Sequence, residues 1–204
     1  AGLLSIATEK EKVFTAYHMM TEYVKLNNPQ GRIYVVHRLD RDTSGVLMAA
    51  KNEKMKHALQ DNWEELVTQR RYHALVEGRL DKKSGTITSW LKETKTMLVY
   101  SSMNDGDGLK AVTEFEVIKE NNDYSLLDIQ LHTGRKNQIR VHMKEQGHSV
   151  AGDKKYGART NPIKRLGLHS YRLELKHPFN GEILCFEAKT PKCFSRVFKT
   201  AEKQ

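Results

Sequence analysis

The segment from residue 37 to residue 46 concentrates charged and turn-forming side chains, in the order His37-Arg38-Leu39-Asp40-Arg41-Asp42-Thr43-Ser44-Gly45-Val46. The β-rich runs 32–36 and 46–50 flank this segment, which predicts a loop between two buried strands. Charges close to a core are costly unless they are paired, so folding alone does not explain their number here. A carboxylate in such a loop can act as a nucleophile or stabilise charge in a reaction. The segment therefore predicts an active site.

The composition predicts a soluble protein with a polyanionic partner. The 204 residues carry a formal net charge of +9, with 38% hydrophobic and 29% charged residues. Such a charge attracts phosphates, although many mildly basic proteins bind nothing acidic. The basic residues gather around the motifs, which favours nucleic acid; they include Arg32, Arg38, Arg41, Arg135, Lys136, Arg140, Lys144, Lys154, Lys155, Arg159, Lys164 and Arg165. No apolar run approaches the roughly 20 residues of a membrane span, so we expect no membrane partner and a cytoplasmic location.

Cysteine and histidine patterns indicate no metal site. Cys185 and Cys193 are too few for a zinc site or a disulfide framework, which favours reduced cytosolic thiols. The nine histidines show no ligand spacing with a carboxylate or cysteine partner. We therefore expect no metal, and a monomer is the default expectation.

Hydrophobic periodicity and turn signals predict an α+β fold. Apolar residues at helical spacing indicate helices over 9–26 and, after a cap at Asn52, over 55–67; a third is expected over 136–146, ending at Gly147. Alternating or branched runs predict strands over 72–77, 85–91, 97–101, 111–119 and 124–131. Residues 168–175 and 182–188 are expected to form a hairpin around Asn180-Gly181. The order is not a βαβ alternation, which favours a mixed or antiparallel sheet.

The motif His-Arg-Leu-Asp-x-x-Thr-Ser-Gly resembles the signature of the RluA-type pseudouridine synthases, and further matches follow in the same order along the chain. They are Arg71-Tyr72-His73-Ala74-Leu75-Val76-Glu77-Gly78, Thr133-Gly134-Arg135-Lys136-Asn137-Gln138-Ile139-Arg140-Val141-His142, Gly152-Asp153-Lys154-Lys155-Tyr156-Gly157, Leu168-His169-Ser170 and His177-Pro178-Phe179-Asn180-Gly181-Glu182. The resemblance implies a long bent sheet flanked by helices, with a central catalytic cleft. It also implies isomerisation of uridine to pseudouridine in structured ribosomal or transfer RNA, without a cofactor. Residues 1–204 are then one catalytic domain, and because the chain starts inside a family motif, its N-terminal part is expected to be missing.

The resemblance also assigns roles to residues. Asp40 is the implied catalytic carboxylate, Arg140 its partner through a bidentate ion pair, and Tyr72 the surface on which the everted base stacks. Contacts with RNA are expected from four basic residues, which are Arg38, Arg41, Arg135 and Lys136. One position departs from the family pattern, because Asn137 stands where members commonly carry histidine.

Several alternatives stay open at this level. Asp42 precedes a Thr-Ser-Gly turn and is expected to hydrogen-bond the turn backbone, and Arg38 either fills the space of the everted base or pairs with Asp42. Tyr72 is otherwise a core tyrosine and Arg140 a solvated arginine. His37 and Ser44 are expected to fix the loop, and Asp153 and Tyr156 to anchor a turn. At the level of function, the alternatives are a non-catalytic RNA-binding module on the same fold and a glycosidase acting on a nucleoside.

Overall fold

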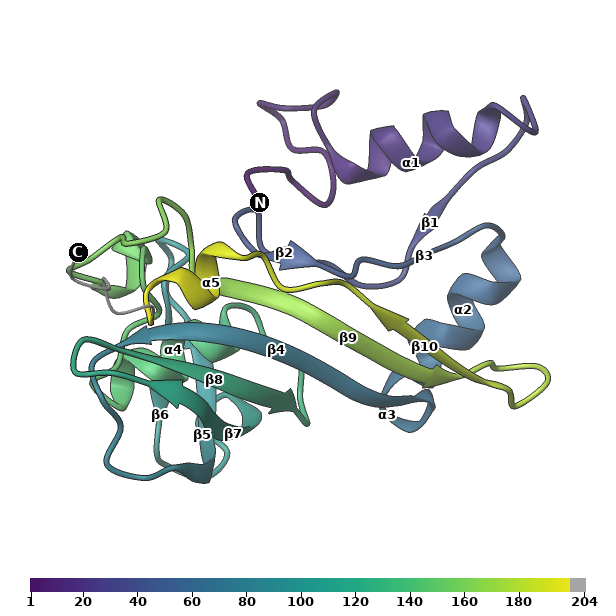
Figure 1. The fold of residues 1–204 in the computed structure, drawn as a ribbon. Coiled ribbons are helices and arrows are strands. Elements are labelled where there is room, and N and C mark those ends of the chain that lie inside the picture. Colours follow the sequence, from purple (N-terminus) through teal and green to yellow (C-terminus); the bar gives the residue numbers. More distant parts are fainter. Residues whose placement is uncertain (199–204) are drawn as a thin grey trace.

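The computed structural model describes residues 1–198, and its centre is an eight-stranded sheet (Figure 1). Seven strands follow the order β10-β9-β4-β8-β7-β5-β6 in antiparallel pairs, and the short β2 (Ser44–Gly45) adds to β9 in parallel. Their bounds are β4 (Val67–Glu77), β5 (Ser84–Glu93), β6 (Val99–Ser102), β7 (Leu109–Glu120), β8 (Tyr124–Leu131), β9 (Leu168–Lys176) and β10 (Ile183–Glu187). The expected α+β class with a mixed sheet is confirmed.

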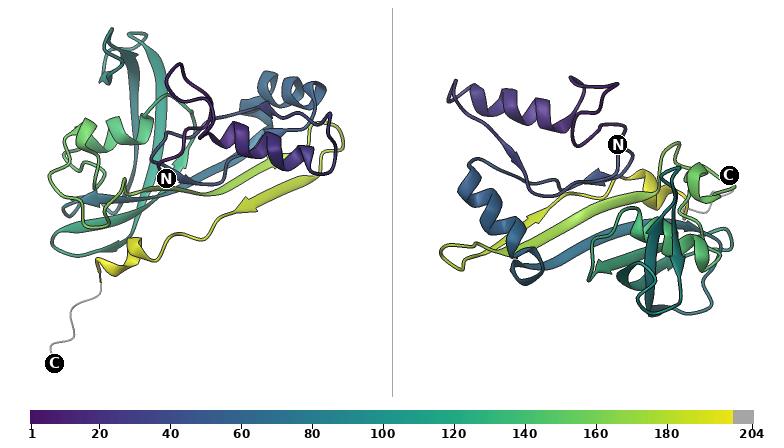
Figure 2. Two further views of the ribbon diagram at one scale, coloured as in Figure 1. Left: turned by 90° about the horizontal axis from the view of Figure 1, so that it is seen from above. Right: turned by 180° about the vertical axis from the view of Figure 1, so that it is seen from behind.

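The sheet is bent, which separates two packed regions. In the left view of Figure 2, β5 to β7 rise steeply from the plane of β9 and β10. The larger apolar cluster lies between β4, β8 and the helix α4 (Gln138–Glu145), and it contains Ile129, Ile139 and Met143. A second cluster lies between β9 and the segment before β4, around Leu59 and Leu173. The strand β4 contributes to both regions and so connects them.

The alternation of side chains along β4 assigns its residues to opposite faces of the sheet. Tyr72, Ala74 and Val76 pack into the larger cluster, as expected for residues two apart on a strand. Arg71 points to the other face, where its guanidinium donates two hydrogen bonds to the Asp128 carboxylate. The same alternation places the side chain of Tyr72 on the face that carries α4.

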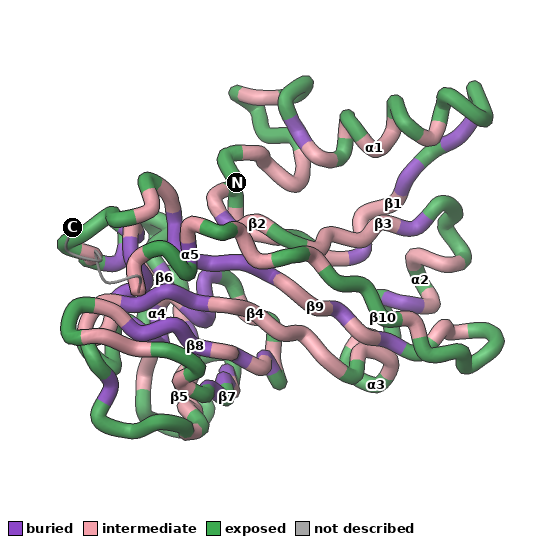
Figure 3. The backbone as a smooth tube through the Cα atoms, in the orientation of Figure 1, coloured by how far each residue is buried: buried purple, intermediate pink, exposed green. Residues whose placement is uncertain are grey.

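The first helix is shorter than the sequence predicts. It was expected to begin at residue 9, whereas α1 spans Ala16–Lys25 and is capped by Thr15, which accepts a hydrogen bond from the His18 N–H. The Glu11 carboxylate accepts hydrogen bonds from the N–H groups of Val13 and Phe14, and this local turn competes with helix formation. No residue of α1 is buried, and the helix stands clear of the long strands (Figures 1 and 3).

The second predicted helix is divided into two. Asn52 caps α2 (Glu53–Asp61) as expected, through a hydrogen bond from the Met55 N–H. Asn62 then leaves the helical conformation, and α3 (Trp63–Leu66) follows as a single turn. The break lets both pieces keep their apolar residues on the second cluster, where Met55, Leu59, Trp63 and Leu66 meet.

The buried strands expected over the whole of 32–36 and 46–50, on either side of the charged loop, are not formed at that length. In their place are β1 (Tyr34–Val35) and β3 (Ala49–Ala50), an antiparallel pair of two residues each. The chain between them leaves this pair because Ser44 and Gly45 join β9 instead. The loop is thus held by the main sheet and not by a hairpin of its own.

The remaining predicted elements agree with the structure apart from their bounds. The helix expected over 136–146 is α4, and Gly147 follows it with φ +82°. The 3₁₀ turn η1 (Lys154–Tyr156) and the short helix α5 (Cys193–Arg196) complete the described chain. Within residues 1–198, none of the helices has the length and apolar character required to cross a membrane.

Buried histidine makes the stability of the fold sensitive to mild acid. His142 on α4 is fully buried, its ring nitrogens lying 2.9 Å from Ser89 Oγ and 2.8 Å from Thr113 Oγ1, and burial lowers its pKa to about 4. The unfolded chain therefore binds a proton near pH 6.5 that the folded chain does not bind, so stability falls as the pH falls below that value. At pH 5 the loss from this one residue is about 2 kcal/mol.

We expect urea unfolding to show this loss between pH 7 and pH 5, a range above the usual carboxylate pKa values. The His142→Gln variant should be less stable at pH 7 but should lose less stability on acidification. His57→Gln is the control, because it makes the same replacement at an exposed position on α2 and leaves the buried His142 in place. An unchanged dependence in His142→Gln would contradict the assignment.

Candidate active site

A cleft of about 680 Å³ lies between the charged loop and the start of α4. The segment Leu4–Thr8, the loop, β4 and the residues from Gly134 to Arg140 form its walls. Every site residue expected from the sequence lines this cleft; they are Arg38, Asp40, Arg41, Tyr72, Arg135, Lys136 and Arg140. The fold therefore brings together side chains that are as much as a hundred positions apart in the chain.

Arg140 connects the Asp40 carboxylate to a second, buried carboxylate. Its Nη1 donates to Asp40 Oδ2 at 2.9 Å, while its Nε and Nη2 donate to the two oxygens of Asp153 at 2.6 and 2.8 Å. The bidentate pair expected with Asp40 is thus made with Asp153, whose side chain is 2% exposed, and Asp40 receives a single bond. Geometry explains this difference, because one edge of the planar guanidinium can serve only one carboxylate.

The charge state of Arg140 follows from these contacts. Burial by itself would lower the pKa of its guanidinium, but the hydrogen bonds and charges of Asp153 and Asp40 outweigh burial and raise that pKa above its ordinary value. Asn137 Oδ1 accepts a further hydrogen bond from Nη1 at 3.0 Å, and the Tyr156 ring lies 4.9 Å from the guanidinium carbon. The cation is held rigidly, so it can fix the position of the Asp40 carboxylate.

Asn137, the position that departs from the family pattern, takes part in this support. Its backbone has the left-handed conformation, with φ 54°, and its Nδ2 donates to the Tyr156 hydroxyl at 2.9 Å. The same hydroxyl accepts from the Val99 N–H at 3.2 Å. Asparagine fits here because it tolerates a positive φ and offers both a donor and an acceptor.

Backbone and hydroxyl contacts shape the loop around Asp40. The Thr43 N–H donates to the Asp40 carbonyl at 3.0 Å, and Ser5 Oγ donates to the Leu39 carbonyl while accepting from the Leu39 N–H. The Asp40 side chain is 31% exposed and remains accessible from the cleft. Its carboxylate is therefore oriented by its surroundings and still open to a reactant.

Ser44 and Gly45 attach the loop to β9. The His169 Nε2–H donates to the Ala188 carbonyl at 3.1 Å, so His169 Nδ1 accepts from the Ser44 hydroxyl at 2.7 Å. Arg165 Nη2 also donates to Ser44 Oγ at 2.7 Å. At Gly45, with φ +119°, a Cβ would lie 1.9 Å from the Ser170 carbonyl oxygen, so glycine is required.

Asp42 does not make the contact with the turn backbone that we expected, and one of the two alternatives left open for Arg38 is not formed. No hydrogen bond joins the Asp42 carboxylate to the turn backbone in residues 1–198, because the turn is closed by the Thr43 N–H, and Asp42 faces Arg41 at 3.4 Å. The alternative pair between Arg38 and Asp42 is not formed either, since Asp42 has this other partner. Exposed Arg38 lines the cleft.

Arg135 and Lys136, the two RNA contacts predicted within the motif 133–142, have partners within the protein. Lys136 forms an ion pair with Glu93, and Arg135 Nε donates to the Lys110 carbonyl at 3.0 Å. Arg135 and Arg140 point to different partners, as their five-residue spacing across a helix start predicts. Both Lys136 and Arg135 nevertheless line the cleft, so their remaining donors are available there.

Tyr72 forms one wall of the cleft from β4. Burial raises the pKa of its phenol. A hydrogen bond with the Ser170 side chain and the charge of Arg70 oppose this rise, and the nearby Asp40 carboxylate adds to it. The phenol is accordingly neutral at pH 7. A neutral half-buried phenol offers both a flat surface for stacking and a proton that can be donated.

Two functional candidates were not found from the sequence. Asp153 was expected only to anchor a turn, and it does accept from the Tyr156 N–H, but it also holds Arg140. Arg70 has no role expected from the sequence motifs, although it precedes Tyr72 by two positions and therefore shares its face of β4. That spacing is the signal that would have identified it.

Residues 2–145 match the family described as RNA pseudouridylate synthase, and the chain belongs to that family. The membership expected from the motifs is therefore confirmed. In Bacillus subtilis, a protein named RNA pseudouridine synthase YjbO is 35% identical over 178 residues, covering 87% of this chain and 62% of the relative. Ribosomal large subunit pseudouridine synthase D of Borreliella burgdorferi is 34% identical over 194 residues, covering 93% of this chain and 60% of the relative. This chain thus spans about three fifths of the length of these two relatives.

Solved structures show the same fold. Human RNA pseudouridylate synthase domain containing 4 superposes with a TM-score of 0.78 at 21% identity, covering 97% of this chain and 85% of that one. Human RNA pseudouridylate synthase domain containing 1 gives a TM-score of 0.68 at 24% identity, covering 84% and 74%. The expected pseudouridine-synthase-like fold is confirmed.

Proposed function

We propose that this protein isomerises uridine to pseudouridine in RNA, with Asp40 as the catalytic carboxylate. The observation that carries the proposal is the placement of Asp40 in a cleft of a pseudouridylate synthase fold, 2.9 Å from Arg140 and with Tyr72 in the same cleft. In the reaction the bond between N1 of uracil and C1′ of ribose breaks, and a bond between C5 and C1′ forms. N1 gains a proton and C5 loses one, so no oxidant or group donor is required.

Each of the three residues has a part in this reaction. The Asp40 carboxylate attacks the nucleotide or stabilises positive charge on the sugar as the base detaches. Arg140 holds that carboxylate in position through the hydrogen bond from its Nη1. Tyr72 stacks against the detached base and supplies or accepts the proton that must move. Arg38, Arg41, Arg135 and Lys136 bind the RNA around the everted nucleotide.

Ribosomal RNA is the substrate that we favour. The relative from Borreliella burgdorferi is named for the large ribosomal subunit and shares 34% identity over 93% of this chain. The net charge of +9 suits a folded RNA with dense phosphates. Transfer RNA is the alternative substrate, and both are included in the test.

The test uses unmodified transcripts of ribosomal and transfer RNA that carry tritium at C5 of uracil. Isomerisation releases tritium into water while the base stays attached to the RNA. A glycosidase would instead release free uracil, and a non-catalytic RNA-binding module would bind the transcripts and release neither. Binding of both transcripts without any release of tritium would contradict the proposal and favour the binding module.

The Tyr72→Phe variant separates stacking from proton transfer. The ring is kept, so we expect RNA affinity to change by no more than about threefold, whereas loss of the hydroxyl should slow tritium release about 10²-fold or more. Tyr171→Phe is the matched control, because the Tyr171 phenol contacts Asp128 on the opposite face of the sheet. Tritium release at the wild-type rate in Tyr72→Phe would show that the Tyr72 hydroxyl takes no part in proton transfer and that the residue acts by stacking alone.

A further inference from the structure

Among residues 1–198, Arg70 lies in the cleft without a protein partner. It lines the cleft from β4, on the same face as Tyr72, and is half-buried. Arg140 is bound by two carboxylates, but no hydrogen bond or ion pair engages the Arg70 guanidinium within residues 1–198. A half-buried guanidinium that makes no hydrogen bond within the described residues can donate to a ligand in the cleft.

The loop beside Arg70 provides space for its guanidinium. A Cβ added at Gly134 would lie 2.4 Å from Arg70 Nη1, which is closer than any real contact. The φ angle of Gly134 is outside the left-handed region, so its backbone conformation does not demand glycine. Glycine at position 134 instead leaves the space that the end of the Arg70 side chain occupies.

A second arginine follows directly in the same loop. Arg135 donates its Nε–H to the Lys110 carbonyl and also lines the cleft. Burial is the main cause that lowers the pKa of Arg70, and the positive charge of Arg135 adds to it, while Tyr72 and Glu64 oppose it. In the described part of the chain, no carboxylate forms an ion pair with either guanidinium. Two adjacent cations in one cleft form a site for an anion.

We propose that Arg70 and Arg135 together bind one phosphate of the RNA, adjacent to the nucleotide whose base enters the cleft, and that Gly134 leaves the space this requires. The proposal rests on the proposed function, which makes RNA the occupant of the cleft. A phosphate is the anion of RNA, because uracil and ribose are uncharged, and it accepts parallel hydrogen bonds from a guanidinium. Arg70 is thus a binding residue that sets where the backbone lies relative to Asp40.

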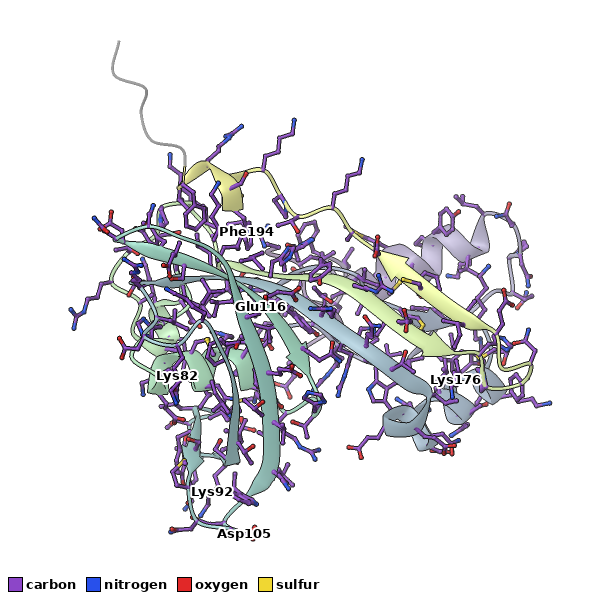
Figure 4. The ribbon with its side chains drawn as sticks, turned by 60° about the horizontal axis from the view of Figure 1, so that its bottom comes forward. Lys82, Lys92, Asp105, Glu116, Lys176 and Phe194 are labelled. Carbon is purple, nitrogen blue, oxygen red and sulfur yellow. The ribbon has the colours of Figure 1, made fainter. Side chains whose placement is uncertain are left out.

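The first test measures how salt weakens binding of the unlabelled ribosomal transcript. Each lost phosphate contact reduces the slope of log affinity against log salt concentration by about 0.7 to 0.9. We expect Arg70→Gln to show this reduction, and to melt no earlier than the wild type because an unpartnered cation is removed. Lys82→Gln is the control, because Lys82 is exposed in the turn between β4 and β5 (Figure 4). Lys82 is not among the residues that line the cleft, so the slope should stay unchanged. A wild-type slope in Arg70→Gln would overturn the proposal.

The second test displaces Arg70 without changing any charge. Gly134→Ala should push the guanidinium aside and reduce the salt slope as Arg70→Gln does. In the double variant Arg70→Gln with Gly134→Ala, the second substitution should not reduce the salt slope further, because the guanidinium that it displaces is already absent. Additive losses in the double variant would contradict the arrangement. If Gly134→Ala does not fold, Arg70→Lys provides the second variant: it keeps the charge and loses the fork, and should weaken binding at a nearly unchanged slope.

Tritium release by the wild type distinguishes failure of this proposal from failure of the proposed function. No release from either transcript, together with a reduced slope in Arg70→Gln, would overturn the isomerase and leave the phosphate site standing. Release by the wild type, with equal slopes in all variants, would overturn the phosphate site alone.

Discussion

Replacing Asp40 by asparagine should reduce tritium release by at least about 10³-fold while RNA affinity changes by no more than about threefold. The substitution removes the charge needed in the reaction but keeps an oxygen that can accept the hydrogen bond from Arg140 Nη1. Arg140 also remains paired with Asp153, so the cleft should keep its shape. The two measurements are the initial rate of tritium release and the affinity for the same transcript.

Asp42 provides the matched control for this experiment. It lies in the same loop, two positions on, and its carboxylate faces exposed Arg41. We expect Asp42→Asn to release tritium within a few-fold of the wild-type rate. Equal losses in the two variants would indicate that the charge of the whole loop matters, and a near-normal rate in Asp40→Asn would reject Asp40 as the catalytic carboxylate.

Replacing Arg140 by alanine should have the largest effect on stability, and it should also lower the activity. Asp153 is almost fully buried and would lose the cation that binds both of its oxygens. Removing one partner of a buried ion pair destabilises a protein by about 3–5 kcal/mol. Asp40 would lose its orienting partner at the same time, so tritium release should fall by about 10²-fold or more even below the melting temperature.

A double variant separates these two effects. Arg140→Ala with Asp153→Ala removes both charges, so much of the lost stability should return while the rate stays low. Arg135→Ala is the control, because Arg135 begins the same motif but makes no buried ion pair, and its unfolding free energy should change by less than about 1 kcal/mol. Chemical unfolding and tritium release measure the two quantities. A double variant as unstable as Arg140→Ala would show that the unpaired carboxylate is not the cause.

Local sequence signals predicted most elements of the main sheet. The alternating run 124–131 became β8 with the same bounds, and the Asn180-Gly181 turn lies between β9 and β10. Such signals succeed because a strand that buries one face shows alternating apolar and polar residues in its own sequence. They failed at residues 9–15, where the turn at Glu11 competes with helix formation, and at Asn62, where the chain changes direction to keep two apolar faces on one cluster.

The chain by itself determined which residues could do chemistry. The loop around Asp40 stands out by its residue types alone, and the resemblance to the family motifs identifies the strand that carries Tyr72 and the motif that contains Arg140. Composition likewise indicated a polyanionic partner. These features are local or additive, so no knowledge of folding is needed to see them.

Only the tertiary structure decided how these residues are paired. Arg140 forms its bidentate ion pair with Asp153 and donates only one hydrogen bond to Asp40. The end of Arg70 lies against Gly134. The physical reason is that a guanidinium has few edges and a cleft has limited space, so each contact excludes another. These competing contacts form between segments that are distant in the sequence, so a motif within one segment cannot predict which of them forms.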